Sequence, residues 1–194
     1  MRVLVGCEFS GTVRDAFASK QHEAWSCDLL PSSGNHYQQD VCEVLSRGWD
    51  LIILHPPCTA LAVSGNAHYG REKPKHNERL EAISWTLALW ELAKKCADKV
   101  ALENPVGVLP LKPAQYIQPW EFGHGETKKT GLWLYNLPPL MTTVHDQGRE
   151  QKIWKMGPSK NRAKLRSITY SGIAEAMADQ WGDEPIKQQE QQNG

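Results

Sequence analysis

The sequence has no excess of charge of one sign, no apolar run of membrane-spanning length and no cysteine pair spaced as CxxC. Lys plus Arg and Asp plus Glu both number 22, so the zero net charge offers no global argument for a nucleic-acid or membrane partner. The first residues, MRVLVGCEFSG, lack the charged-then-apolar pattern of a secretory signal. We therefore expect a cytoplasmic protein with no membrane partner, in which any site for a polyanion is local.

Cysteine usage also excludes some classes of protein. The chain has an odd number of scattered cysteines: Cys7, Cys27, Cys42, Cys58 and Cys96. This pattern argues against a disulfide framework and against a zinc site, so we expect no metal. With 194 residues and 40% hydrophobic content, the chain is long enough to close one core. The polar tail, residues 183–194, is expected to be disordered.

Short apolar runs alternate with amphipathic stretches along the chain. Strands are predicted over 2–6, 22–27, 50–55 and 99–104, and helices over 11–20 and 77–97. This alternation predicts an α/β fold with a mainly parallel sheet. In such sheets, ligands bind at the carboxyl ends of the strands.

Polar residues follow several of these predicted strands. The turn GCEFSG follows the first strand, Asp28 the second, HPPCT the fourth and ENP the fifth, and Asp40 comes from the segment between. An acid after the second strand is where nucleoside-binding proteins accept hydrogen bonds from ribose, and a glycine in the first turn lets a ligand approach the backbone. EFSG has one glycine where a dinucleotide fingerprint has three, so this evidence is weak alone.

Cys58 stands behind two prolines at a strand end. A buried cysteine is usually a small hydrophobic residue. Here the prolines stiffen the backbone and the side chain is expected to face the cleft, as a fixed thiolate for covalent catalysis must. Glu103 comes at the matching position of the next strand, although a solvated rim charge or a helix cap is an equally good reading of that residue alone. Cys58 is the only cysteine expected at a strand end beside a carboxylate.

Two motifs, PPC (56–58) and ENP (103–105), resemble the nucleophile and glutamate motifs of the cytosine-5 DNA methyltransferases. CTALAVSGN (58–66) looks like the mobile catalytic loop of that family. EFGHGETKKTGLWL (121–134) is similar to its Gln-x-Arg-x-Arg block, and SGIAEAMADQWG (171–182) to its closing helix. The resemblance covers most of residues 1–182, which we therefore expect to form a single domain.

The resemblance implies a Rossmann-like fold that binds S-adenosylmethionine, with helices on both faces of the sheet. It implies that Cys58 adds to carbon 6 of a cytosine in DNA, that Glu103 bonds or protonates ring nitrogen 3, and that carbon 5 is methylated. Asp28 is expected at the cofactor ribose and Asp40 at the adenine amine. The full cofactor set that it implies is Cys7, Glu8, Ser10, Gly11, Asp28, Leu29, Asp40, Val41 and Pro57. The substrate set is Pro56, Ser64, Lys128, Thr130, Trp154, Lys160 and Arg162.

This chain departs from the family pattern in two informative ways. Thr130 stands where the family has the arginine that holds the cytosine carbonyl. Between the strand ending near Tyr135 and the helix starting near Ser171 there are roughly 35 residues, too few for a separate target-recognition domain. We therefore expect low sequence specificity, as would suit a phage or mobile element, and a setting in a bacterial cell or phage-infected host.

The short insert, about 136–166, is rich in cations. Its stretch 149–166 carries seven Lys or Arg residues, including Lys160 and Arg162, against the single acid Glu150, with Trp154 between them. A charge run is often only a solvated surface. The alternative is a surface that follows the phosphates of DNA, with a stacking aromatic residue.

Three other functions stay open at this point. The enzyme could modify carbon 5 of a free pyrimidine nucleotide such as dCMP. It could methylate an exocyclic amine, although the usual (Asp/Asn)-Pro-Pro-(Tyr/Phe) motif needs no thiol and His55 and Cys58 occupy its outer positions. It could also be a non-enzymatic DNA-binding module with a relic cofactor pocket.

Overall fold

The computed structural model describes residues 1–144 and 167–182. Its sheet has seven strands in the order β3-β2-β1-β4-β5-β7-β6. Strands β3, β2, β1, β4 and β5 are mutually parallel, and β7 is antiparallel to both of its neighbours. The strands are β1 (Arg2–Gly6), β2 (Glu23–Asp28), β3 (His36–Gln38), β4 (Leu51–Leu54), β5 (Lys99–Pro105), β6 (Gln115–Ile117) and β7 (Thr130–Tyr135). The predicted α/β class with a mainly parallel sheet is confirmed.

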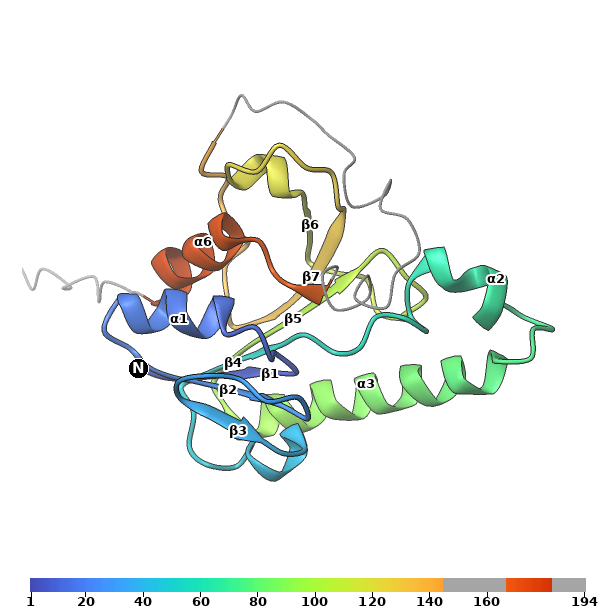
Figure 1. Ribbon diagram of the computed structural model, residues 1–194, viewed down its shortest axis with the longest axis horizontal. Helices are drawn as coiled ribbons and strands as arrows, with labels where there is room; N and C mark the ends of the chain where they lie inside the picture. The colour runs from blue at the N-terminus through green and yellow to red at the C-terminus, as the bar shows by residue number, and fades with distance from the viewer. Residues whose placement is uncertain (145–166, 183–194) are drawn as a thin grey trace, which may run out of the picture.

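Helices cover both faces of the sheet, as predicted. Figure 1 shows α1 and α6 side by side on one face and the long α3 on the other. The helices are α1 (Thr12–Ser19), α2 (Asn66–Tyr69), α3 (His76–Cys96) and α6 (Ser171–Gly182), with 3-10 turns η1 (Val41–Glu43), η2 (Val63–Gly65) and η3 (Pro119–Phe122). None of the helices within the described ranges is both long and apolar enough to cross a bilayer.

The central strands are continuously apolar because each face of the sheet has its own core. Val3, Val5 and Ile53 pack under α1 and α6, whereas Leu4 and Ile52 pack under α3. All five side chains are fully buried. Such two-sided burial is the reason that parallel strands show runs of Val, Ile and Leu without polar alternation.

The strand order reverses direction between β1 and β4. The chain first builds outward from β1 through β2 to β3, and then returns to place β4 on the other side of β1. The chain leaves β1 toward α1 on one face of the sheet and leaves β4 toward α3 on the other, the arrangement in which α/β proteins commonly bind ligands at the carboxyl edge. The His55 amide, just past β4, donates to the Gly6 carbonyl at 2.9 Å and marks this point.

Strands β3 and β6 do not appear among the predicted elements. Each has three residues and lies at an edge of the sheet, paired on one side only. Their sequences, HYQ and QYI, are too short to show a period. They are strands because a neighbouring strand pairs with them; their own residues show no strand pattern.

Candidate active site at the carboxyl edge of the sheet

His55 and Glu103 form a buried pair at the ends of β4 and β5. Leu54 pairs with Leu102 in the sheet, so the next residues of the two strands lie side by side. His55 Nδ1 is 3.1 Å from Glu103 Oε2, and the two side chains are 7% and 15% exposed. Burial by itself raises the pKa of the Glu103 carboxyl, but the His55 hydrogen bond, the Lys128 charge and the Thr130 hydrogen bond outweigh it, and the pKa falls below its usual value. Glu103 is therefore a fixed carboxylate at neutral pH.

A second hydrogen bond joins the HPPC motif to the ENP motif. Asn104 Nδ2 donates to the Pro56 carbonyl at 3.0 Å, and Asn104 is 1% exposed. His55 and Pro56 of HPPC are thus hydrogen-bonded to Glu103 and Asn104 of ENP, respectively. Pro56 is buried and Pro57 is exposed. The structure therefore brings the two predicted catalytic motifs together.

Cys58 is half-buried and begins a turn. Its carbonyl accepts from the Leu61 amide at 3.1 Å and the Ala62 amide at 2.8 Å. The turn continues into the segment 60–66, which contains the exposed Ser64 on η2. Cys58 therefore has a backbone position set by the two prolines before it and the turn after it.

Arg79 of α3 holds the segment 60–66 in place. Its guanidinium donates to the Ala60 carbonyl at 2.7 Å, to Asn66 Oδ1 at 2.8 Å and to the Ala62 carbonyl at 3.2 Å. The Val63 amide also donates to the Val106 carbonyl at 3.1 Å. The segment expected to behave as a mobile loop is thus tethered here. Arg79 is not among the predicted site residues, because its burial on an otherwise exposed stretch of α3 depends on the tertiary fold.

A small pocket opens in front of Glu103. Its enclosed part is about 10 Å³, room for about one water molecule, and the rest of the space between its lining residues is open to solvent. Its lining consists of Glu103, Ile117, Pro119, Lys128, Thr130, Thr169, Tyr170 and Ile173. Two predicted substrate residues, Lys128 and Thr130, therefore share a pocket with the predicted catalytic carboxylate. Tyr170 and Thr169 join them from the segment before α6 and were not among the predicted residues.

The turn after β1 differs from a phosphate-binding turn. The Glu8 carboxylate accepts from the Val13 amide at 2.7 Å and the Arg14 amide at 3.3 Å, at the start of α1. Ser10 Oγ donates to the same carboxylate at 3.2 Å. A helix N-terminus attracts phosphate through these amides, and a carboxylate that already occupies them repels it. Glu8, predicted as a cofactor ligand, is instead 5% exposed and caps α1.

Asp28 and Asp40 converge on Cys7 at this end of the edge. Burial, followed by the charge of Asp28 and smaller contributions that include Asp40, raises the pKa of the Cys7 thiol far above its usual value. Cys7 has φ 59°, a left-handed conformation that is uncommon outside glycine. The expectation that Cys58 alone lies at a strand end beside a carboxylate is wrong. Cys7 follows β1 and feels the charge of Asp28, but its raised pKa keeps it a neutral thiol and leaves Cys58 as the candidate nucleophile.

The two acids keep part of their hydrogen-bonding capacity. Asp28 Oδ1 accepts from the Leu30 amide at 2.8 Å, and Asp40 Oδ1 accepts from the Cys42 amide at 2.8 Å. Between them, Leu29 is 71% exposed, an apolar side chain on the rim. Val41, also predicted at the cofactor, is 4% exposed and packs in the core under α3, so only its backbone can face a ligand.

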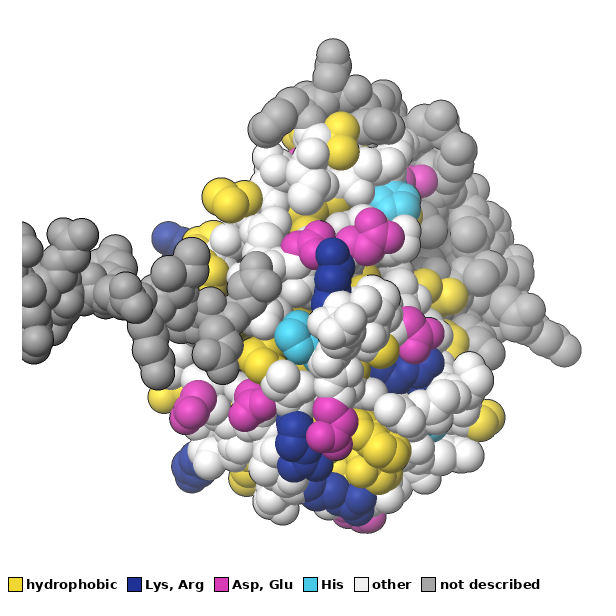
Figure 2. Space-filling view, turned by 90° about the vertical axis from the view of Figure 1, so that its left-hand side faces the viewer, with side chains coloured by type: hydrophobic (Ala, Val, Ile, Leu, Met, Phe, Trp, Pro, Cys, Tyr) yellow, Lys and Arg dark blue, Asp and Glu magenta, His cyan; other side chains and the backbone are white. Residues whose placement is uncertain are grey.

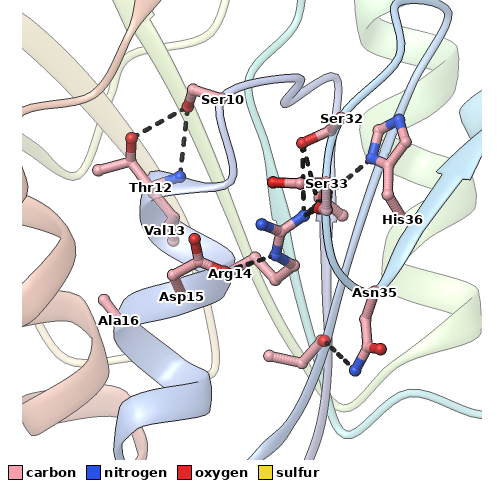
Figure 3. A network of polar contacts seen from close by, with 12 residues as sticks. Ser10, Thr12, Val13, Arg14, Asp15, Ala16, Ser32, Ser33, Asn35 and His36 are labelled. Carbon is pink, nitrogen blue, oxygen red and sulfur yellow. Dashed lines mark hydrogen bonds and ion pairs between the residues drawn. The ribbon is translucent and has the colours of Figure 1, made fainter.

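A buried arginine fixes the segment that follows Asp28. Figure 3 shows the Arg14 guanidinium between α1 and the segment 32–36. Arg14 donates to Ser26 Oγ at 2.9 Å and to the Ser33 carbonyl at 2.6 Å, and Ser26 Oγ lies 2.8 Å from His36 Nδ1. Gly11, another predicted cofactor residue, has φ 74°, and a Cβ there would overlap the Arg14 guanidinium. The left-handed backbone therefore favours glycine at this position.

The amino edge of the sheet has a different character. Figure 2 shows acidic and basic side chains next to one another on this side, without a continuous patch of one sign. Arg2 at the start of β1 and Glu23 at the start of β2 form an exposed ion pair at 3.2 Å. Such exposed pairs contribute little to stability.

No protein-family model matches the chain, and no curated protein matches it. Within residues 1–144 and 167–182, no group of three or more His, Cys, Asp or Glu side chains could hold a metal ion. Trp154, Lys160 and Arg162, predicted to contact DNA, lie outside the described residues, as do the basic stretch and the polar tail.

Proposed function

We propose that this protein is an S-adenosylmethionine-dependent methyltransferase that modifies carbon 5 of cytosine in DNA through a covalent Cys58 adduct. The observation that carries the proposal is the double tie between HPPC and ENP, through His55 to Glu103 at 3.1 Å and Asn104 to Pro56 at 3.0 Å. A nucleophile for carbon 6 and a carboxylate for nitrogen 3 must reach opposite sides of one ring, because these two atoms lie across the ring from each other. Adjacent strand ends with joined loops meet that requirement.

The chain's own residues support each step. The Cys58 thiolate adds to carbon 6, while a proton taken up from water is shared between ring nitrogen 3 and the Glu103 carboxylate. When bound, S-adenosylmethionine supplies the methyl group as an electrophile. Loss of the carbon 5 proton then expels Cys58 as a thiolate, and the proton held at nitrogen 3 returns to water, which restores the ring. A base in a duplex has to be extruded first, because a stacked ring offers neither face to a thiolate.

The other end of the edge fits a cofactor that is a cation without phosphates. Glu8 occupies the α1 amides that would hold a pyrophosphate. Asp28 and Asp40 keep oxygens for ribose hydroxyls and an adenine amine, and the exposed Leu29 offers an apolar surface for a base. A nicotinamide or flavin dinucleotide would place its phosphates against Glu8, whereas S-adenosylmethionine has a sulfonium charge and no phosphate.

The direct test is trapping with DNA that contains 5-fluorocytosine, in which fluorine at carbon 5 cannot leave as a proton does. The wild type should form a covalent complex that survives denaturing electrophoresis, and Cys58→Ser should form none. Cys42→Ser is the matched control, because Cys42 is exposed on η1 and should trap normally. Methyl transfer at the wild-type rate by Cys58→Ser would contradict the mechanism. Calorimetry with S-adenosylhomocysteine tests the cofactor separately.

A free nucleotide is the second candidate acceptor. It is favoured by the roughly 35 residues between Tyr135 and Ser171, which leave no room for a recognition domain. Transfer of a tritiated methyl group to dCMP and to duplex DNA, measured side by side, decides between the two acceptors. If only dCMP is labelled, the free nucleotide replaces DNA as the proposed substrate, and the proposed methylation of carbon 5 is unchanged.

A further inference from the structure

The pocket in front of Glu103 raises a question about how a pyrimidine carbonyl is held. Thr130 stands at the position where an arginine was expected. Its hydroxyl donates to the Lys128 carbonyl at 3.1 Å and also lies within hydrogen-bonding reach of the Glu103 carboxylate. A hydroxyl has one proton, and both acceptors for that proton belong to the protein. Thr130 is therefore a poor donor to a substrate.

Lys128 is occupied as well. Its positive charge is one of the causes that lower the pKa of Glu103, so the ammonium is drawn to that carboxylate. Both polar residues on the β7 side of the pocket thus serve Glu103. A donor for a ring carbonyl has to come from another part of the lining.

Tyr170 supplies such a group. It lines the pocket from the segment before α6, and its hydroxyl is buried with no hydrogen-bond partner among the described residues. Burial, followed by the charge of Glu126, raises the pKa of Tyr170 to about 12, so the phenol keeps its proton and acts as a neutral donor. A buried hydroxyl without a partner is costly for the fold, and a ligand oxygen would remove that cost.

Tyr170 is held rigidly enough to position a ligand. Its ring packs against His124 with a centroid distance of 5.0 Å, and His124 Nε2 accepts from the Gly172 amide at 2.9 Å. The Tyr170 carbonyl also accepts from the Ala174 amide at 3.1 Å, which anchors it to the first turn of α6. The apolar side chains of Ile117 and Ile173 complete the pocket walls.

We infer that Tyr170 donates its hydroxyl hydrogen to the ring carbonyl oxygen of the pyrimidine that Glu103 engages at nitrogen 3. Tyr170 is thus a residue of the substrate site that determines specificity. From another segment of the chain, it provides the hydrogen bond that Thr130 is too short and too occupied to donate. The inference rests on the proposed function, since it places the target base in this pocket.

The test is Tyr170→Phe, which removes one oxygen and keeps the ring on His124. Methyl transfer should be measured on oligonucleotides that carry cytosine or 2-thiocytosine, because sulfur accepts a hydrogen bond more weakly than oxygen. We expect Tyr170→Phe to lower kcat/KM for cytosine about 10-fold, the usual effect of one hydrogen bond. The ratio of kcat/KM for cytosine to kcat/KM for 2-thiocytosine should also become smaller. Tyr116→Phe is the control, because Tyr116 is exposed and lies outside the pocket lining.

Two further measurements separate the explanations. Tyr170→Phe should bind S-adenosylhomocysteine like the wild type and should not melt earlier, because the Tyr170 hydroxyl has no partner within the described residues. A lower melting temperature, or unchanged kcat/KM and an unchanged oxygen preference, would overturn the inference and leave the proposed function standing. If the wild type itself neither binds S-adenosylhomocysteine nor traps 5-fluorocytosine, the proposed function fails and the inference fails with it.

Discussion

The two halves of the carboxyl edge use their polar groups differently. In the half after β1 to β3, buried polar side chains such as Glu8 and Arg14 are bonded to the protein's own backbone and serines. In the half after β4, β5 and β7, His55 Nε2, Asn104 Oδ1 and Tyr170 Oη are buried without a partner among the described residues. Folded proteins satisfy nearly all such atoms, so a water or a ligand is needed as the partner of these three, as it is for Thr86 Oγ1 on α3 and Gln118 Oε1 before η3.

The polar groups of the first half are thus bonded within the protein, whereas the second half keeps unbonded polar groups where our proposal puts the substrate. The turn after β1 is held by Glu8 and the segment after β2 by Arg14, which leaves a prearranged surface for a cofactor. Around Glu103 the protein retains polar groups at a cost to stability. Changes in the second half should therefore affect chemistry more than stability, and changes in the first half the reverse.

The largest effect is expected for Glu103→Gln. The amide keeps the shape of the side chain but removes the charge that His55 and Lys128 hold in place. Because the interaction removed is made mainly in the transition state, kcat should fall by about 10²–10³, the range seen when one oxyanion-type donor is removed, with little change in KM. Steady-state kinetics checks this, with calorimetry of S-adenosylhomocysteine to show an intact first half. A kcat within twofold of wild type would contradict the role of Glu103.

Arg79→Met should have an intermediate effect. The variant removes the bonds to Ala60, Ala62 and Asn66, so the segment after Cys58 loosens and the thiol is aligned less often. We expect the rate of 5-fluorocytosine trapping to fall about 10-fold, as a small misplacement of a reacting group can cause, while S-adenosylhomocysteine binding stays unchanged. Arg71→Met, an exposed change in the loop before α3, is the matched control and should trap normally. Equal trapping by both variants would show that Arg79 does not position Cys58.

Arg14→Met tests whether the half of the carboxyl edge after β1 to β3 contributes to stability. The variant removes a guanidinium that is 3% exposed and leaves Ser26 Oγ and the Ser33 carbonyl without their donor. We expect the free energy of unfolding to fall by about 2–3 kcal/mol, the usual cost of removing buried hydrogen bonds to a charged group. Urea denaturation measures it, and Arg71→Met again serves as the control. A decrease below about 0.5 kcal/mol, typical of surface changes, would show that the network is not stabilising.

The smallest expected effect concerns pH. The pKa of Glu103 is lower in the folded protein than its ordinary value of 4.5, so the unfolded chain binds this proton more readily. The stability that the carboxylate contributes is therefore fully present above pH 4.5 and is lost as the pH falls through the folded-state pKa. The difference in unfolding free energy between the wild type and Glu103→Gln should be constant from about pH 6 to 7 and shrink in acid. If the difference in unfolding free energy grows in acid, the pKa of Glu103 is raised by folding, which contradicts this prediction.

Much of the fold could be predicted because local patterns encode it. Strands β1, β4 and β5 are apolar runs that end in punctuated turns, and α3 shows a sustained helical stripe. The positions of Asp28 and Cys58 followed from where the apolar runs stop, whereas Glu103 was expected just after the fifth strand and lies within β5, which continues to Pro105. The antiparallel direction of β7 and the short edge strands did not follow, since pairing between distant segments defines them.

The sequence by itself determined the α/β class, the positions of the strand ends and the residue types that follow them, because burial on both faces and turn chemistry act over a few neighbouring residues. Only the tertiary structure decided which of those residues meet. The register of β4 against β5 placed His55 beside Glu103, the Arg14 guanidinium joined α1 to Ser26 and Ser33, and the docking of α6 against α1 brought Tyr170 to the pocket. These contacts join residues far apart along the chain, and no local pattern specifies such a contact before the sheet and its helices have assembled.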